Sequence, residues 1–144
     1  MTLNLHDFEG DWQIERRIVD HLTGRTGRLQ GRAQFAPDPE GLTYEEAGQL
    51  EFPGQPPLSA TQRYLWRQQG GAIDILFADG RAFHSFDPAH ATPNASHDCP
   101  PDWYEVSYSF VDWPAWSAQW SVRGPRKNYI STTRYTRLCD SEQL

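Results

Sequence analysis

The segment Phe8-Glu9-Gly10-Asp11-Trp12-Gln13-Ile14 opens the first run of alternating residues, and the fold prediction is built outward from it. Glycine permits a tight turn or the close approach of another segment. Trp12 needs a partner for both its ring and its indole N–H. Residues 131–137 of the last run offer Arg134 and Arg137, and a guanidinium lying flat on the indole face would pair the arginine with the ring through a cation–π contact. A contact between the first and last strands is the one that closes a barrel.

Short alternating runs separated by turn signals recur along the chain, and no segment shows helical periodicity over three turns. The runs predicted as strands are 12–19, 28–36, 42–52, 60–68, 72–78, 81–87, 103–111, 115–123 and 128–138. Short turns predict antiparallel neighbours, and closure of such a meander removes its exposed edges. We therefore predict an all-β fold, in which residues 1–144 form a single antiparallel up-and-down barrel of about eight to ten strands.

Two segments lie outside these runs. Residues 88–101 are predicted to form a long loop, which is often functional or mobile, and residues 139–144 a frayed tail. In and beside the loop, His97, Cys99 and Asp102 match no strong ligand spacing, so no metal site is predicted and their role stays open. Cys99 and Cys139 are not expected to form a disulfide in a reducing compartment.

The charge pattern excludes several classes of partner. The net charge is −6, the arginines are scattered and Lys127 is the only lysine, which argues against a nucleic-acid surface. No apolar run approaches the length of about 18 residues that a membrane helix needs. The first residues lack the basic and apolar regions of a signal peptide. We therefore predict a cytoplasmic protein with no nucleic-acid or membrane partner.

Polar and aromatic side chains at inward positions predict a pocket. A barrel of this size is about wide enough to hold one small ligand, although the same rings could fill the interior as plain core. Arg16 shares a face with apolar residues, so it needs a partner. That partner is either Glu46, in a structural ion pair, or a carboxylate or phosphate of a ligand. The candidate ligand-binding residues are Arg16, Tyr44, Tyr64, Trp66, His84, Tyr108, Trp120 and Tyr135.

Two further features have both a structural and a functional interpretation. His84 lies inside a predicted strand, either as a hydrogen-bonded wall residue sharing a face with Ala82 and Phe86, or as a pocket base or ligand anchor. The turn Asp112-Trp113-Pro114-Ala115-Trp116 either exposes its rings at a barrel mouth or packs them under the long loop.

Gly10-x-Trp12 in the first strand, with Arg134 or Arg137 in the last, resembles the signature of the calycin group, the lipocalins and fatty-acid-binding proteins. The chain looks most like an uncharacterised bacterial lipocalin-like family of unknown function. This resemblance implies a β-barrel around a small-molecule site. A short turn replaces the two-helix lid of fatty-acid-binding proteins. No histidine follows His97, whereas nitrobindin-like haem barrels use a late one, and no cofactor is predicted.

The functional prediction is a protein that binds a small, partly apolar or anionic molecule inside its barrel. One alternative is an enzyme that acts on a small molecule in the same barrel, with His84 as general acid or base. The other is an interaction domain that forms a homodimer through surface aromatics.

Overall fold

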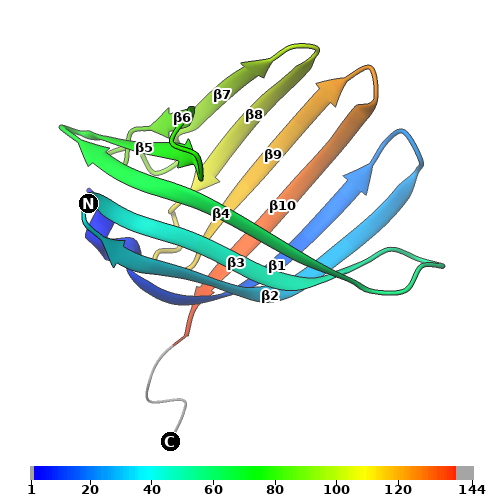
Figure 1. The fold of residues 1–144 in the computed structure, drawn as a ribbon, viewed down its shortest axis with the longest axis horizontal. Coiled ribbons are helices and arrows are strands. Elements are labelled where there is room, and N and C mark those ends of the chain that lie inside the picture. The colour runs from blue at the N-terminus through cyan, green and yellow to red at the C-terminus, as the bar shows by residue number, and fades with distance from the viewer. Residues whose placement is uncertain (1, 139–144) are drawn as a thin grey trace, which may run out of the picture.

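Ten antiparallel strands form one sheet that curls into a nearly closed barrel in the computed structural model, which describes residues 2–138 (Figure 1). The elements are the 3-10 helix η1 (Leu5–Phe8) and strands β1 (Gly10–Asp20), β2 (Arg25–Asp38), β3 (Gly41–Glu51), β4 (Leu58–Gln69), β5 (Ala72–Phe77), β6 (Ala82–Phe86), β7 (Asn94–Cys99), β8 (Asp102–Ser109), β9 (Trp116–Gly124) and β10 (Lys127–Arg137). The sheet order is β6-β5-β4-β3-β2-β1-β10-β9-β8-β7. The predicted all-β antiparallel up-and-down barrel is confirmed.

The seam between β6 and β7 is the one place where consecutive described strands are not joined by a hydrogen-bonded ladder. Side chains bridge it instead. The rings of Phe83 on β6 and His97 on β7 meet edge to face, with their centroids 5.2 Å apart. The barrel is therefore closed by backbone pairing at β1–β10 and by aromatic contact at β6–β7.

The prediction that residues 88–101 form a loop is wrong in part, because they contain β7. This strand pairs with β8, placing His97 opposite Tyr104. Only Ala95 and His97 are partly buried, while the other β7 residues are exposed. A strand that buries so few apolar side chains carries little of the alternation by which strands are recognised in a sequence. The predicted tail 139–144 lies outside the described residues.

Trp12 and Arg137 form the predicted contact between the first and last strands. They lie opposite each other in the β1–β10 register, and the Arg137 guanidinium carbon lies 4.0 Å from the centre of the Trp12 ring. Gly10 has φ +121°, and a Cβ atom there would stand 3.2 Å from Nη1 of Arg137, so this position favours glycine. Arg137, rather than Arg134, completes the signature, because Arg134 is exposed.

Helix η1 covers one end of the barrel, which we call the closed end. Nε1 of Trp12 donates to the Phe8 carbonyl oxygen at 2.9 Å, and Arg137 donates to the carbonyl oxygens of Glu9 and Asp7. Phe8 is fully buried and meets Trp113 edge-on with ring centroids 5.1 Å apart. The rings of the 112–116 turn therefore pack at the closed end and not at a mouth.

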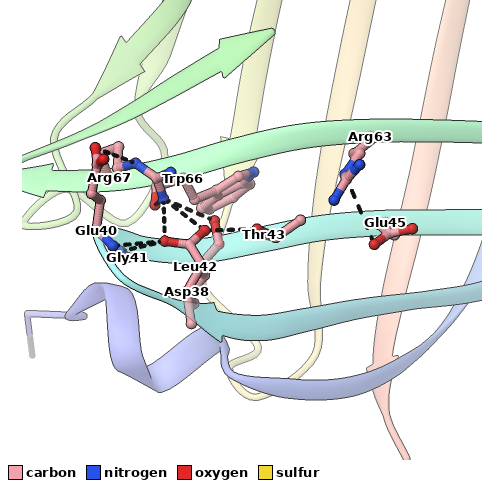
Figure 2. A network of polar contacts seen from close by, with 9 residues as sticks. All are labelled: Asp38, Glu40, Gly41, Leu42, Thr43, Glu45, Arg63, Trp66 and Arg67. Atoms are coloured by element: carbon pink, nitrogen blue, oxygen red, sulfur yellow. Dashed lines mark hydrogen bonds and ion pairs between the residues drawn. The ribbon is translucent and has the colours of Figure 1, made fainter. Parts of the chain in front are cut away.

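A polar network fixes the β2–β3 turn beside this end (Figure 2). Asp38 accepts hydrogen bonds from Nη1 of Arg67 at 3.0 Å and from Oγ1 of Thr43 at 2.6 Å. Burial would raise the pKa of Asp38, but the hydrogen bonds from Thr43 and the Glu40 amide, with the charge of Arg67, lower it to about 2. The carboxylate therefore stays ionised and holds the turn.

Candidate functional site

A cavity of about 430 Å³ lies inside the barrel. It extends toward the end that carries the hairpins β1–β2, β3–β4 and β9–β10, where its lining includes Asp20, Phe52 and Tyr129. These hairpins lie away from η1, on the right of Figure 1. Because η1 is the only helix among residues 2–138, no helix in that part of the chain covers this second end, which we call the open end.

All eight residues predicted to bind a ligand line this cavity. They are Arg16, Tyr44, Tyr64, Trp66, His84, Tyr108, Trp120 and Tyr135. They come from seven strands, and their common direction follows from strand alternation, since every second side chain of a strand faces the interior. The interior is therefore not filled by its own side chains along its whole length.

The floor of the cavity is made by rings that also belong to the closed end. Trp116 and Tyr135 stack in parallel, with centroids 3.7 Å apart and planes 2° apart. Trp66 is buried beside them, and its ring centroid lies 6.3 Å from that of Trp116. These packed rings separate the cavity from Trp12 and η1.

Arg16 forms a double ion pair with Glu46 inside the cavity. Nη1 donates to Oε2 at 2.7 Å and Nη2 to Oε1 at 2.9 Å, while Nε donates to Oγ1 of Thr133 at 2.6 Å. Tyr44 donates to the same carboxylate at 2.5 Å and lies 2.8 Å from the Tyr135 hydroxyl. Of the two partners considered for Arg16, the structure therefore shows Glu46.

This network keeps its charges paired and its phenols protonated. Burial would lower the pKa of Arg16, but the hydrogen bonds and charge of Glu46 raise it above its ordinary value. Burial, with the nearby Glu46, raises the pKa of Tyr44 and of Tyr135. At neutral pH Arg16 therefore keeps its positive charge, and both phenols stay uncharged.

His84 and Tyr108 form a second polar pair in the wall. Nε2 of His84 lies 2.7 Å from the Tyr108 hydroxyl, and the His84 residue is 8% exposed. Within residues 2–138, its buried Nδ1 atom has no hydrogen-bond partner, and neither has the buried indole Nε1 of Trp116. Burial, and next electrostatic repulsion from the His97 ring, lower the pKa of His84 to about 3. The imidazole is therefore neutral at physiological pH.

Phe83 and His84 are adjacent on β6, where strict alternation puts neighbours on opposite faces, yet both line the cavity. The β5–β6 register shifts between Ile75 and Leu76, and such an irregularity changes the direction of the neighbouring side chains. Phe83 stacks in parallel on Trp120, with centroids 5.0 Å apart and planes 4° apart. The sequence carries no signal for this shift.

The residues whose role stayed open do not form one site, although Cys99 lies opposite Asp102 in the β7–β8 register. His97 faces the aromatic seam, Cys99 is exposed, and Asp102 lies 3.5 Å from Nζ of Lys127. Among residues 2–138, no group of three His, Cys, Asp or Glu side chains is placed to hold a metal ion. Cys139 lies outside the described residues, so the structure does not test the predicted absence of a Cys99–Cys139 disulfide.

Tyr104 and Tyr129 also line the cavity and were missed as site residues. The signal for both was present in the sequence. Tyr104 has the phase of Tyr108 on β8, and Tyr129 has the phase of Tyr135 on β10, so extending each alternation toward the hairpins finds them.

Comparison with known proteins identifies the family and the fold. Residues 8–137 match a family of unknown function (DUF6314), so the chain belongs to that family. An S-type phycobiliprotein lyase (CPES) from Guillardia theta is similar in structure, with a TM-score of 0.63 and 9% identity over 94% of this chain and 91% of the lyase. A DUF3598 protein of unknown function from Nostoc punctiforme has a TM-score of 0.58 and 10% identity over 95% of this chain and 50% of that one.

At these identities the structural similarity concerns the fold alone. No curated protein sequence matches significantly. Within residues 2–138, no helix is long and apolar enough to cross a membrane.

Proposed function

We propose that this DUF6314 protein binds a small, partly apolar molecule in the barrel cavity. The observation that carries the proposal is a cavity of about 430 Å³ walled mainly by aromatic rings, with a few polar groups among them. This volume lies within the usual range of ligand pockets, roughly 300–1,000 Å³. A mainly apolar wall with a few polar groups is also the usual composition of such pockets.

The charges of the wall favour an uncharged ligand over an anionic one. Glu46 already neutralises Arg16 at 2.7 Å, and Asp20 adds a negative charge to the lining. An anion entering the cavity would have to compete with Glu46 for the guanidinium, because both require the same fork of N–H donors.

The state of His84 favours binding over acid–base catalysis. A general base works best when its pKa lies near the working pH, whereas the pKa of His84 is lowered to about 3 by burial and next by electrostatic repulsion from the His97 ring. The enzyme alternative therefore receives less support from this residue than the binding function does.

The fold-level likeness to a phycobiliprotein lyase is consistent with a small molecule as the partner of this barrel. Similarity of fold does not supply the ligand. The cytoplasmic location and the homodimer stay predictions.

A neutral aromatic dye, N-phenyl-1-naphthylamine, tests the proposal. We expect one-to-one saturable binding with a rise in fluorescence. Ala118→Leu should weaken it at least about tenfold, because this buried residue lines the cavity and the added carbons occupy ligand space. Ala47→Leu is the matched control, since Ala47 is exposed on β3. Absence of saturable binding, or equal effects of the two substitutions, would contradict the proposal.

A further inference from the structure

We propose that residues 58–63 of β4 are a strand-addition site for an extended peptide, and that one apolar side chain of this peptide enters the barrel cavity. This site rests on the proposed function, and it names the class of ligand that the cavity takes. Three features support it: an unpaired backbone edge, a hollow on each face of the sheet at that edge, and the aromatic interior beside it.

Residues 58–63, which we call the free edge, have a strand partner on one side only. β3 pairs with β4 from Leu58 onward, whereas β5 pairs with β4 only from Tyr64 to Gln69. Figure 1 shows β5 and β6 beside the left part of β4. Among residues 2–138, no strand besides β3 and β5 pairs with β4. The backbone groups on the second side of the free edge therefore lack a ladder.

Strand alternation identifies the residues that carry these unpaired groups. A two-residue turn, 70–71, separates Gln69 from Ala72, and the residues that flank such a turn form a hydrogen-bonded pair. Every second residue of an antiparallel strand directs its N–H and C=O to the same side. The odd-numbered residues of β4 therefore direct these groups away from β3. On the free edge they are Ser59, Thr61 and Arg63.

The free edge has few of the features that protect edge strands from pairing. Charged side chains, proline and bulges usually block such an edge. Five of the six residues are exposed, and no charge, proline or register shift interrupts residues 58–62. Arg63 and Pro57 stand only at its two limits. The free edge is therefore open to an added strand.

A hollow lies on each face of the sheet at this edge. Gln62 lines the barrel cavity. It also lines a shallow hollow of about 750 Å³ on the outer face, together with Thr61, Arg63 and Ala78. A strand added along the free edge would direct alternate side chains to these two faces. In strand addition, main-chain hydrogen bonds supply affinity and pockets for alternate side chains supply specificity, and the free edge offers both.

The chemistry of the two hollows defines the peptide. The cavity is walled mainly by aromatic rings, of which Tyr64 follows Gln62 on the inward face of β4, so it favours an apolar side chain. The outer hollow contains charges of both signs, including Arg63 and Glu45, so it favours polar side chains. The peptide therefore alternates between polar and apolar residues, with an aromatic side chain opposite Gln62.

A second copy of the chain matches this site less well than a separate peptide does. The free edge contains no aromatic residue. Two copies that paired edge to edge would therefore bring no ring to the aromatic cavity of either barrel. An aromatic side chain on an extended peptide fills that cavity, while its backbone completes the ladder of β4.

A short peptide with two controls tests the site in the unmodified protein. The probe is acetyl-Thr-Thr-Phe-Thr-Thr-amide. We expect it to displace N-phenyl-1-naphthylamine and to slow hydrogen exchange at the Thr61 and Arg63 amides, as followed by proton–nitrogen NMR. Replacing Phe by Ala should weaken binding at least about tenfold, because the apolar contact is lost. Methylating the backbone nitrogens of the two Thr residues beside Phe should weaken it at least about fivefold.

Two substitutions of Thr61 test the edge from the side of the protein. Thr61→Pro removes the unpaired N–H, and an edge strand tolerates proline where the N–H points to solvent. We expect at least about tenfold weaker peptide binding. Binding of N-phenyl-1-naphthylamine should change by less than about twofold, because Thr61 does not line the cavity, and this shows that the variant is folded. Thr61→Ala keeps the N–H, so it should weaken peptide binding by less than about threefold.

The outcomes separate the strand-addition site from the proposed function. If the dye binds but the peptide does not displace it, or if the methylated peptide binds equally well, the site is wrong and the binding function stands. If neither the dye nor the peptide binds, both proposals are overturned. A dimer in sedimentation that Thr61→Pro abolishes would show that a second copy occupies the free edge, and it would overturn the peptide site.

Discussion

The closed and open ends of this barrel are built from the same strands and are both rich in aromatic rings, yet they differ in how tightly those rings are packed. At the closed end, Trp12 Nε1 bonds a carbonyl oxygen and Arg137 covers the indole face. Four residues along the same face of β1, Arg16 lines a cavity of about 430 Å³. Aromatic content alone therefore does not distinguish core from site, whereas packing does.

Removing a ring at the closed end should give the largest effect. We expect Trp12→Ala to cost about 3–5 kcal/mol of unfolding free energy, because the residue is 0% exposed and its loss leaves a cavity. Trp103→Ala, at 38% exposure on β8, should cost less than about 1 kcal/mol. Urea denaturation measures both. Similar losses of unfolding free energy in the two variants would contradict the view that the closed end is structural core.

Acid should weaken the open end through His84. The folded pKa of about 3 lies below the ordinary value of 6.5, so the unfolded chain binds more protons between these values. The stability that neutral His84 provides is present above pH 6.5 and is lost as the pH falls toward 3. Between pH 7 and pH 4, the unfolding free energy of the unmodified protein should therefore fall by up to about 3 kcal/mol more than that of His84→Gln. Urea denaturation at each pH measures both proteins. An equal fall of unfolding free energy in the two would contradict this prediction.

Removing one charge from the cavity should change which ligands enter it. Glu46→Gln leaves Arg16 without its carboxylate, so we expect a loss of roughly 1–3 kcal/mol in stability. We also expect about a tenfold gain in affinity for 8-anilinonaphthalene-1-sulfonate, because the freed guanidinium attracts the sulfonate. N-phenyl-1-naphthylamine, the same scaffold without a charge, is the control and should bind with little change. A fluorescence titration in which both dyes respond alike would refute the charge argument.

Breaking the ion pairs of Figure 2 should give the smallest losses of unfolding free energy. The loss should be larger for the buried pair than for the exposed one. Arg67→Ala breaks a mostly buried contact with Asp38 and should cost roughly 1–3 kcal/mol. Arg63→Ala breaks an exposed contact with Glu45 at 3.9 Å, where the expected cost is below about 0.5 kcal/mol. Thermal or urea unfolding distinguishes the two, and equal costs would show that burial does not determine the contribution of these pairs.

Much of this fold could be predicted because β1 and β10 show a clear alternation of inward-facing and outward-facing residues. The phase of Trp12 and Arg16 on one strand, and of Tyr135 on the other, also placed the cavity-lining side chains correctly. By contrast, β7 buries too few apolar residues to show a period of two. The choice between Arg134 and Arg137 depended on register, and so did the pairing of Arg16 with Glu46 across three strands. Register is set by contacts that a single sequence does not display.

The irregularity between β5 and β6 could not be foreseen for the same reason. It brings Phe83 into the cavity beside His84, although strict alternation puts them on opposite faces. The seam that these residues share with His97 has no backbone ladder, so it depends on side-chain packing that no local pattern encodes.

The tryptophan indoles offer the most direct test of the central claim, that the open end holds a ligand while the closed end is structural. We would follow the indole N–H signals by proton–nitrogen NMR while titrating N-phenyl-1-naphthylamine. We expect saturable shifts for Trp66 and Trp120, which line the cavity, and unchanged signals for Trp12 and Trp103. Unchanged signals throughout, or a shift of Trp12 equal to that of Trp120, would contradict it.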